Sequence, residues 1–354
     1  MRITIHLLQL LLLVIMGHPS FCQRNHVETK GIYGHPQKLW EKGYRLNELG
    51  INAVFLHHQS IDDTFMARAR KEGQKVYAEF AALNGEDYVQ QHPEAWAIDK
   101  RGNKVEKATW FLGVCPTDPN FLQYRLDQLK TLVTTYDVDG VWLDYLHWHA
   151  QFEDPEPILP ETCFNASCVT AFQAAAGLDI PEVSTAEQAS YILANHEDAW
   201  RQWRCSVIAD WVKKCSTTLQ QHKPGAQLGI YHCPWNDDEY DSARIRILAL
   251  DYAMLKPHVD VFSPMVYHKR MGRDARWVRD NINWFSEKIN DATVKIWPIV
   301  QAYNDPGIVS PEAFEQVMRY AISGSSTGVM MFTSSAIAED DRKIEVIKKL
   351  YGAW

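Results

Sequence analysis

The sequence predicts a (β/α)8 barrel, the TIM-barrel fold, with long loops after the third and fourth strands. Eight short apolar segments recur along the 354 residues, and a helical pattern follows each of them. This regular alternation in one chain of this length is typical of the eight-stranded barrel, whereas a doubly wound open sheet would not usually need eight evenly spaced units. The expected strands cover residues 30–34, 52–58, 75–82, 139–148, 227–235, 259–268, 295–304 and 328–335.

The helices between these strands carry boundary signals. The expected helix 62–72 begins at the acidic residue Asp62 and ends before Gly73, and the expected helix 36–49 ends before Gly50. Acidic residues favour the first turn of a helix and glycine favours the position after its end. These signals support the assignment of the intervening segments as helices.

Two of the connections are much longer than the others. They cover about residues 84–118, after the third strand, and about residues 149–196, after the fourth strand. Both follow strands, so they lie on the face where barrels of this kind build their active sites. The connections on the opposite face are short, which favours a site covered by long loops.

The N-terminal residues 1–22 have the pattern of a secretory signal peptide. A short apolar run extends from Leu7 to Met16, which is too short to span a bilayer, and cleavage is expected after Cys22. We therefore expect a secreted or periplasmic protein whose residues 23–354 form a single domain, and no membrane span. Its oligomeric state is not predicted.

Removal of Cys22 leaves six cysteines, and an even number in an exported chain favours disulfide bonds. Cys163 and Cys168 flank a short loop and could pair. Cys205 and Cys215 lie ten residues apart in one expected helix, about 15 Å from each other, so they cannot pair. The connectivity stays open. The same region contains a glycosylation sequon at Asn165.

The charge of the chain argues against one class of partner. The formal net charge is −8 and no basic run occurs, so we do not expect nucleic acid as a partner. The chain contains 13 tryptophans and 15 tyrosines. Aromatic faces with nearby carboxylates and amides are what a sugar site needs, because sugars stack their C–H faces on rings and need fixed partners for their hydroxyls.

Asp144 is the strongest catalytic candidate. Side chains alternate along a strand, so Trp142 and Asp144 share one face of the fourth strand, while Val141 and Leu143 share the other. The apolar pair is expected to pack on the helices, which turns Asp144 into the mouth of the barrel. Glu79 has the same position on the third strand.

An acidic run after the fifth strand supplies two more carboxylates, Asp237 and Glu239. Polar and aromatic residues at the remaining strand ends are the candidates for substrate binding. They are Tyr33, His57, His58, Tyr145, His147, Trp148, Tyr231, His232, Trp235, Tyr267, Gln301 and Tyr303.

Three stretches of the sequence resemble the family 10-like glycosyl hydrolases, a group of secreted glycosidases with this barrel. The stretches are "CPTDPNFLQYRLDQLKTLVTTYDVDGVWLDYLHW", "WRQWRCSVIADWVKKCSTTLQQHKPGAQLGIYHCPW" and "VDVFSPMVYH". The resemblance covers most of residues 30–335 and implies a glycosidase domain. The chitinase pattern is different, because Leu146 occupies the position of its catalytic glutamate.

The resulting hypothesis is a retaining glycoside hydrolase that acts on an oligosaccharide or polysaccharide. Such hydrolysis needs one ionised carboxylate and one carboxylic acid that donates a proton. Asp144 is the expected nucleophile, and the acid is either Glu79 or a residue of the loop with Asp237 and Glu239, with the loop preferred. No cofactor or metal is expected in this site. The alternatives are a non-catalytic carbohydrate-binding barrel and a metal-dependent hydrolase that uses the histidines near the strand ends.

Overall fold

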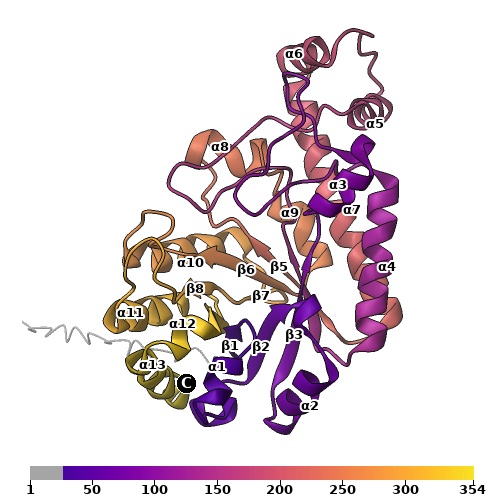
Figure 1. Cartoon of the computed structure of the whole chain (residues 1–354). Helices are drawn as coiled ribbons and strands as arrows, with labels where there is room; N and C mark the ends of the chain where they lie inside the picture. Colours follow the sequence, from indigo (N-terminus) through magenta and orange to yellow (C-terminus); the bar gives the residue numbers. More distant parts are fainter. Residues whose placement is uncertain (1–26) are drawn as a thin grey trace, which may run out of the picture.

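A computed structural model describes residues 27–354 and confirms the (β/α)8 barrel (Figure 1). The predicted signal peptide, residues 1–22, lies outside the described residues. The strands are β1 (Thr29–Tyr33), β2 (Ala53–His57), β3 (Lys75–Ala81), β4 (Gly140–Asp144), β5 (Gln227–His232), β6 (Val261–Val266), β7 (Lys295–Ile296), β8 (Ile299–Gln301) and β9 (Gly328–Phe332).

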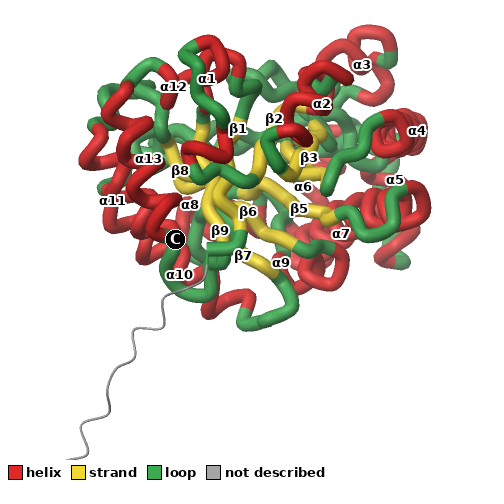
Figure 2. Tube along the Cα trace, turned by 90° about the horizontal axis from the view of Figure 1, so that it is seen from below, coloured by secondary structure: helices red, strands yellow, loops and turns green. Residues whose placement is uncertain are grey.

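All strand pairs in the sheet are parallel, and the sheet closes on itself because β1 pairs with both β2 and β9. The short segments β7 and β8 together fill the seventh position, where a single strand was expected. Trp297 and Pro298 separate them, and Pro298 has no N–H group to donate to a neighbouring strand. The barrel therefore has eight strand positions, and the strands lie inside a ring of helices (Figure 2).

The helices connect the strands and cover the outside of the barrel. They are α1 (Gln37–Glu41), α2 (Asp63–Lys71), α3 (Glu86–Gln91), α4 (Pro119–Thr135), α5 (Ala166–Ala176), α6 (Thr185–Asn195), α7 (Glu197–His222), α8 (Glu239–Arg246), α9 (Tyr252–Leu255), α10 (Ala275–Ile289), α11 (Pro311–Ala321), α12 (Ser334–Ala338) and α13 (Asp341–Ala353), with short 3-10 turns η1 (Leu46–Leu49), η2 (His58–Ser60), η3 (Pro93–Ala95) and η4 (Lys256–His258). Within residues 27–354 no helix combines the length and the apolar character needed to cross a bilayer.

The structure confirms one predicted helix start and divides another predicted helix in two. Asp62 accepts a hydrogen bond from the N–H of Phe65 at 2.7 Å and so caps α2, as its position in the sequence predicts. The expected helix 36–49 is instead divided into α1 and η1. The division falls at Gly43, which has a φ of 86°, a conformation that ends a helical turn.

Aromatic rings fill the interior of the barrel. Trp142 on β4 stacks on Trp297, with ring centroids 5.6 Å apart and planes inclined by 13°, and Tyr77 packs against the same indole. The indole N–H of Trp142 donates to the hydroxyl of Ser263 at 2.9 Å. Burial of one such ring stabilises the fold by about 4–6 kcal/mol at 25 cal per Å². These rings fill the barrel interior below the carboxyl ends of the strands.

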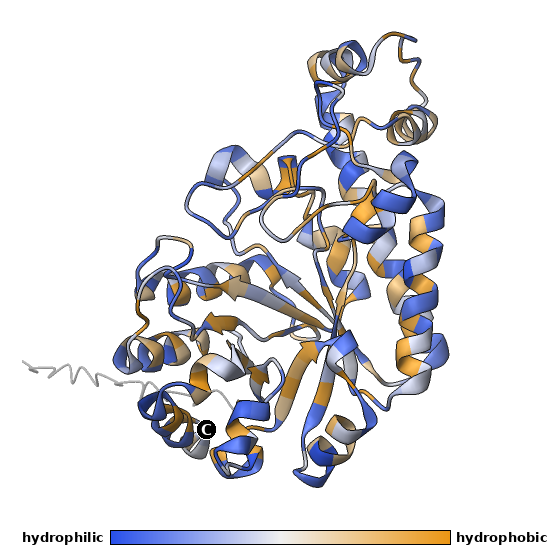
Figure 3. Ribbon diagram, in the orientation of Figure 1, coloured by the Kyte–Doolittle hydropathy of each residue, from blue (hydrophilic) through white to orange (hydrophobic). Residues whose placement is uncertain are grey.

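The side chains of β4 follow the predicted alternation. Trp142 points into the barrel, while Val141 and Leu143 are fully buried on the other side. Figure 3 shows the same division at a larger scale, with hydrophobic strands and with helices that carry both hydrophobic and hydrophilic residues. Burial of both faces of a parallel strand is characteristic of a barrel surrounded by helices.

The two long connections lie at the carboxyl ends of the strands. The first joins β3 to α4 and contains α3, and the second joins β4 to α7 and contains α5 and α6, which lie at the top of Figure 1. The two connections pair with each other, since the N–H of Phe164 donates to the carbonyl of Ile98 at 2.8 Å. This extra layer forms part of the wall around the barrel mouth.

Candidate active site

A cavity of about 330 Å³ opens at the carboxyl ends of the strands, a size within the usual range for small-ligand sites. Carboxyl groups and aromatic rings dominate its surface, and they come from the strand ends and from the long connections. The lining residues are Tyr33, Glu79, Trp110, Asp144, Tyr145, Glu153, Tyr231, Met265, Tyr267, Arg270, Ile299, Tyr303, Asp305 and Phe332.

Asp144 is the last residue of β4 and lines this cavity. Its side chain accepts a hydrogen bond from the N–H of Tyr145 at 2.8 Å. Burial raises the pKa of Asp144 to about 6, and the hydrogen bond from Tyr145 limits the rise. Tyr145 has a φ of 51°, a conformation that is costly for a residue with a side chain and that turns the chain sharply after Asp144.

Glu79 lines the cavity from the neighbouring strand, two residues before Ala81, which pairs with Asp144. The hydroxyl of Tyr33 donates a hydrogen bond to its carboxylate. Burial, and then the negative charge of Asp144, raise the pKa of Glu79 to about 8, although the Tyr33 hydroxyl acts in the opposite direction. Glu79 is therefore a weaker acid than Asp144.

Glu153 is the third carboxyl group of the cavity and lies nine residues after Asp144 in the chain. Its exposed fraction is 8%, and burial, followed by the charge of Asp144, raises its pKa to about 8. Arg270 acts in the opposite direction, but its Nε lies 3.6 Å from the Glu153 carboxylate, too far for a hydrogen bond. The effect of burial therefore exceeds that of the arginine.

Arg270 has other acidic partners that occupy its guanidinium group. It contacts Asp154 at 3.0 Å and Asp305 at 3.2 Å, and it lies over the ring of Trp110, 4.6 Å from the ring centroid. The backbone N–H of Arg270 donates to the side chain of Gln301 at 3.0 Å. Arg270 thus joins three connections around the cavity and divides its charge among Glu153, Asp154 and Asp305.

Aromatic side chains form the remaining wall. Tyr33 and Phe332 pack with ring centroids 4.7 Å apart, and Tyr267 packs on Phe332 at 5.4 Å. Trp110, from the connection after β3, is 39% exposed at the mouth, although it belongs to the wall. A partly exposed indole that is held by Arg270 is a suitable platform for the apolar face of a sugar ring.

Seven of the side chains selected from the sequence meet in this cavity. They are Asp144, Glu79, Tyr33, Tyr145, Tyr231, Tyr267 and Tyr303. Gln301 lies directly behind the wall and is fully buried. It donates hydrogen bonds to the carbonyls of Tyr303 at 3.1 Å and Asp305 at 3.0 Å, so it positions two lining residues.

The histidines and Trp148 lie around this cavity and do not line it. His147 borders a small hollow next to it, and burial lowers its pKa to about 4. His57 and His58 border another hollow, which shares Trp110 with the cavity. Trp148 is fully buried, and its indole packs on the guanidinium of Arg204 at 4.6 Å from the ring centroid.

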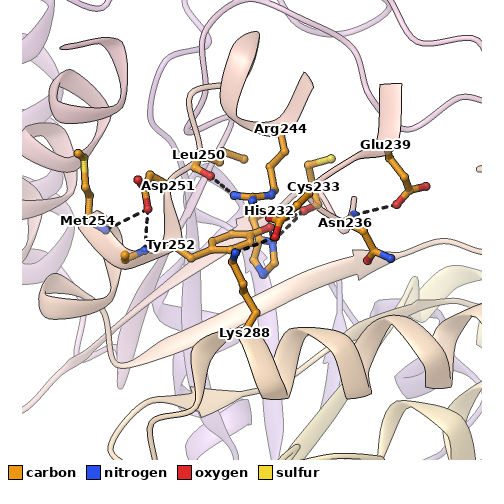
Figure 4. Close-up of polar contacts among 12 residues, drawn as sticks. His232, Cys233, Asn236, Glu239, Arg244, Leu250, Asp251, Tyr252, Met254 and Lys288 are labelled. Atoms are coloured by element: carbon orange, nitrogen blue, oxygen red, sulfur yellow. Dashed lines mark hydrogen bonds and ion pairs between the residues drawn. The ribbon is translucent and has the colours of Figure 1, made fainter. Parts of the chain in front are cut away.

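The polar residues at the end of β5 and after it have their own partners (Figure 4). His232 lies in the core, with Nδ1 3.0 Å from the hydroxyl of Tyr252. Glu239 accepts a hydrogen bond from the N–H of Asn236 at 2.8 Å and pairs with Arg273.

Asp237 and Trp235 likewise do not line the cavity. Asp237 pairs with Arg244 and with Lys288, the latter at 2.7 Å, and it borders a separate hollow. Trp235 is buried against Tyr240 and Phe152. The structure therefore does not bring the acidic run after β5 together with Asp144.

Five polar or aromatic residues of the cavity were not predicted from the sequence: Glu153, Trp110, Arg270, Asp305 and Phe332. Glu153 and Trp110 lie in the two long connections, and the length of these connections on the active-site face was the available signal. Arg270 and Asp305 follow β6 and β8 closely, so their positions just after strand ends were the available signal.

Within residues 27–354, the histidines and carboxylates at the barrel mouth do not form a group of three potential metal ligands. Such a group occurs only at Cys115, Cys163 and Cys168, which lie outside the lining of the cavity. The geometry therefore gives no support to the metal-dependent hydrolase considered from the sequence.

Several solved structures have a similar fold. The glycoside hydrolase domain of PgaB (BpsB) from Bordetella bronchiseptica aligns with a TM-score of 0.70 and 11% identity, over 91% of this chain and 98% of that domain. A β-galactosidase from Marinomonas ef1 aligns at 0.67 and 12%, over 92% of this chain and 59% of the enzyme. α-L-Fucosidase isoenzyme 2 from Paenibacillus thiaminolyticus aligns at 0.60 and 13%, over 92% and 49%.

At these identities the similarity establishes the fold alone. The chain spans little more than half the length of the β-galactosidase and about half that of the fucosidase. Comparison with protein-family models and with curated proteins gives no match. The class defined by fold and site is a (β/α)8 barrel with a carboxyl-rich, aromatic cavity at the carboxyl ends of its strands.

Proposed function

We propose that the protein is a glycoside hydrolase in which Asp144 is the ionised carboxylate and Glu153 is the proton donor. The observation that carries the proposal is that Asp144 and Glu153 line one cavity together with aromatic rings, and that burial raises the pKa of Asp144 to about 6 and that of Glu153 to about 8. Between these values Asp144 is mostly ionised and Glu153 mostly protonated, which is the combination that glycoside hydrolysis requires. The aromatic wall supplies the surface for a sugar.

The proposed reaction retains the configuration of the sugar. Asp144 attacks the anomeric carbon while the bond to the leaving oxygen breaks and Glu153 gives its proton to that oxygen. Water then attacks the anomeric carbon, Glu153 takes up a proton from it, and the bond to Asp144 breaks. Glu153 returns to the acid form and Asp144 to the carboxylate, so both groups are regenerated.

Glu153 is a better candidate for the acid than Glu79. Glu79 lies on a strand inside the barrel, and its carboxylate already accepts a hydrogen bond from Tyr33. Glu153 lies on a connection at the mouth, where it can approach a leaving group that departs toward solvent. We propose that Glu79 positions Tyr33 and, through its protonated state at neutral pH, limits the negative charge beside Asp144.

Aryl glycosides test these assignments. A screen of aryl glycosides and polysaccharides identifies a substrate, and Asp144→Asn is expected to lower its turnover by at least about 10³-fold. Glu153→Gln is expected to slow substrates with poor leaving groups by about 10²–10⁴-fold and to have little effect on activated dinitrophenyl glycosides, which need no proton. Undiminished activity in Asp144→Asn would refute the proposal.

Two matched measurements complete the test. Glu182→Gln, on an exposed glutamate outside the cavity, is expected to leave turnover unchanged. NMR of the first product shows retention if the initial anomer matches the substrate, and inversion would assign Asp144 a different role. Sugar binding that persists without hydrolysis of any glycan, in both wild type and Asp144→Asn, would favour the non-catalytic carbohydrate-binding barrel.

The proposal also places the enzyme outside the cytoplasm, on the basis of the sequence pattern of residues 1–22. N-terminal sequencing of the exported protein is expected to give Gln23 as the first residue. Recovery of the unprocessed chain in the cytoplasmic fraction alone would contradict this part of the proposal without affecting the catalytic assignment.

A further inference from the structure

Three buried cysteines from two separate connections meet beside the barrel. Cys115 ends the connection after β3, and Cys163 and Cys168 belong to the connection after β4. Their sulfur atoms all lie within 4.8 Å of one another, and those of Cys115 and Cys168 are 3.3 Å apart. The structure gives every cysteine among residues 27–354 as a free thiol, so the predicted disulfides stay a prediction.

Hydrogen-bond donors surround this cluster of three thiols. Two backbone N–H groups point at the sulfur of Cys163, those of Ile98 at 3.3 Å and Asn165 at 3.4 Å. The hydroxyl of Thr117 lies 3.1 Å from the sulfur of Cys168, and that of Ser167 lies 3.3 Å from the sulfur of Cys115. Donors of this kind stabilise thiolates, which are the form of cysteine that binds metals.

Burial makes the thiolate state costly unless a cation accompanies it. All three cysteines are fully buried. Three thiolates at this separation would repel one another strongly in a medium of low dielectric constant. A divalent cation between them removes that repulsion.

The charges behind the cluster suit an anionic metal complex. Arg204 is fully buried and close enough for the charges of Cys168 and Cys163 to influence its pKa. Its side chain lies 3.9 Å from Glu161, which also pairs with Arg246 at 2.8 Å. Arg246 also pairs with Asp241 at 3.3 Å, so its charge is shared between two carboxylates. The buried guanidinium of Arg204 is the positive charge that favours a complex of one divalent ion with three thiolates, which carries −1.

We propose that Cys115, Cys163 and Cys168 bind one Zn²⁺ ion, with water or a neighbouring hydroxyl at the fourth position. Thiolate ligands and tetrahedral geometry favour zinc, whose bonds to sulfur of about 2.3 Å place the sulfurs about 3.8 Å apart. The closest pair needs to move apart by only about half an ångström to reach this geometry. A disulfide would engage two of the three sulfurs and leave the third as a buried thiol, whereas one ion engages all three.

The site would fasten the two connections that form the cavity wall. Cys115 lies five residues after Trp110, and Cys163 lies ten residues after Glu153. The backbones of these connections already pair at Phe164 and Ile98, next to the thiols. The ion would cross-link the two connections at this point through its bonds to sulfur. It would thereby hold the indole of Trp110 in a fixed position relative to Glu153. The zinc site does not depend on the proposed glycosidase activity.

Metal analysis of the full chain tests the site. Protein purified without chelator, and loaded with Zn²⁺ where necessary, is expected to retain about one zinc per chain after gel filtration. Cobalt substitution is expected to give a thiolate-to-cobalt absorption band. Cys168→Ser should bind zinc at least tenfold more weakly, while Cys215→Ser, on a buried thiol of α7 outside the cluster, should bind as the wild type does.

Three results would overturn the proposal. The first is the failure of folded wild-type protein, verified by circular dichroism, to bind either metal. The second is peptide mapping that shows a disulfide between two of the three cysteines in the native chain. The third is zinc binding by Cys168→Ser that is as tight as that of the wild type. If Cys168→Ser does not fold, the cobalt spectrum of the wild type decides, because thiolate ligation has its own absorption signature.

Discussion

Replacement of Glu153 by glutamine should stabilise the protein at alkaline pH. Glu153 is 8% exposed, and burial, followed by the charge of Asp144, raises its pKa from 4.5 to about 8. The folded chain therefore holds this proton more tightly than the unfolded chain does. Stability from this group is fully present below pH 4.5 and is lost as the pH rises toward 8, because the folded state must then bury a charge.

The size of the effect follows from the change in pKa. Each pKa step corresponds to about 1.4 kcal/mol, so a rise from 4.5 to about 8 gives an upper limit of about 5 kcal/mol for the stability lost by pH 9. Glutamine has nearly the same shape and cannot ionise. At pH 9 we therefore expect Glu153→Gln to exceed the wild type by about 2–5 kcal/mol, and at pH 5 to match it within about 1 kcal/mol.

Urea denaturation at pH 5, 7 and 9 measures this difference. Glu182→Gln, on an exposed glutamate, serves as the control and is expected to follow the wild type at every pH. Parallel stability profiles for wild type and Glu153→Gln would refute the reasoning, because they would mean that Glu153 ionises in the folded chain as it does in the unfolded chain. The assignment of Glu153 as proton donor would then lose its electrostatic basis.

Two further predictions concern catalysis and the barrel interior. The ratio kcat/KM should rise as the pH passes about 6, where Asp144 ionises, and fall above about 8, where Glu153 loses its proton; a profile without the alkaline fall would contradict the role of Glu153. Gly229→Ala should lower stability by about 1–3 kcal/mol in urea denaturation, because its Cβ would lie 2.1 Å from the indole of Trp142, whereas Gly352→Ala, with open space around it, should change stability by less than about 0.5 kcal/mol.

The part of the site that lies on strands could be predicted from the sequence. The alternation of side chains along β4 placed Asp144 at the mouth and its apolar neighbours against the helices. Tyrosines at five strand ends were also predicted as candidates, and all of them line the cavity. A strand offers only two directions for a side chain, so its sequence nearly fixes which residues face the centre.

The loop residues could not be assigned in this way. Asp237 and Glu239 form an acidic run after β5, yet the first pairs with Arg244 and Lys288 and the second with Arg273. Lys288 belongs to α10, about fifty residues further along the chain, so no local pattern identifies it as a partner. Glu153 shows no such signal in the sequence either, although it lines the same cavity as Asp144.

The sequence alone determined the barrel, because the alternation of apolar segments and amphipathic helices is a local property that eight units repeat. It also determined that a carboxylate ends β4. Only the tertiary structure decided which second carboxyl group shares the cavity, and that three cysteines from distant segments meet. These outcomes depend on the path of two long connections, whose residues are positioned by contacts with each other rather than by the periodicity of a strand or helix.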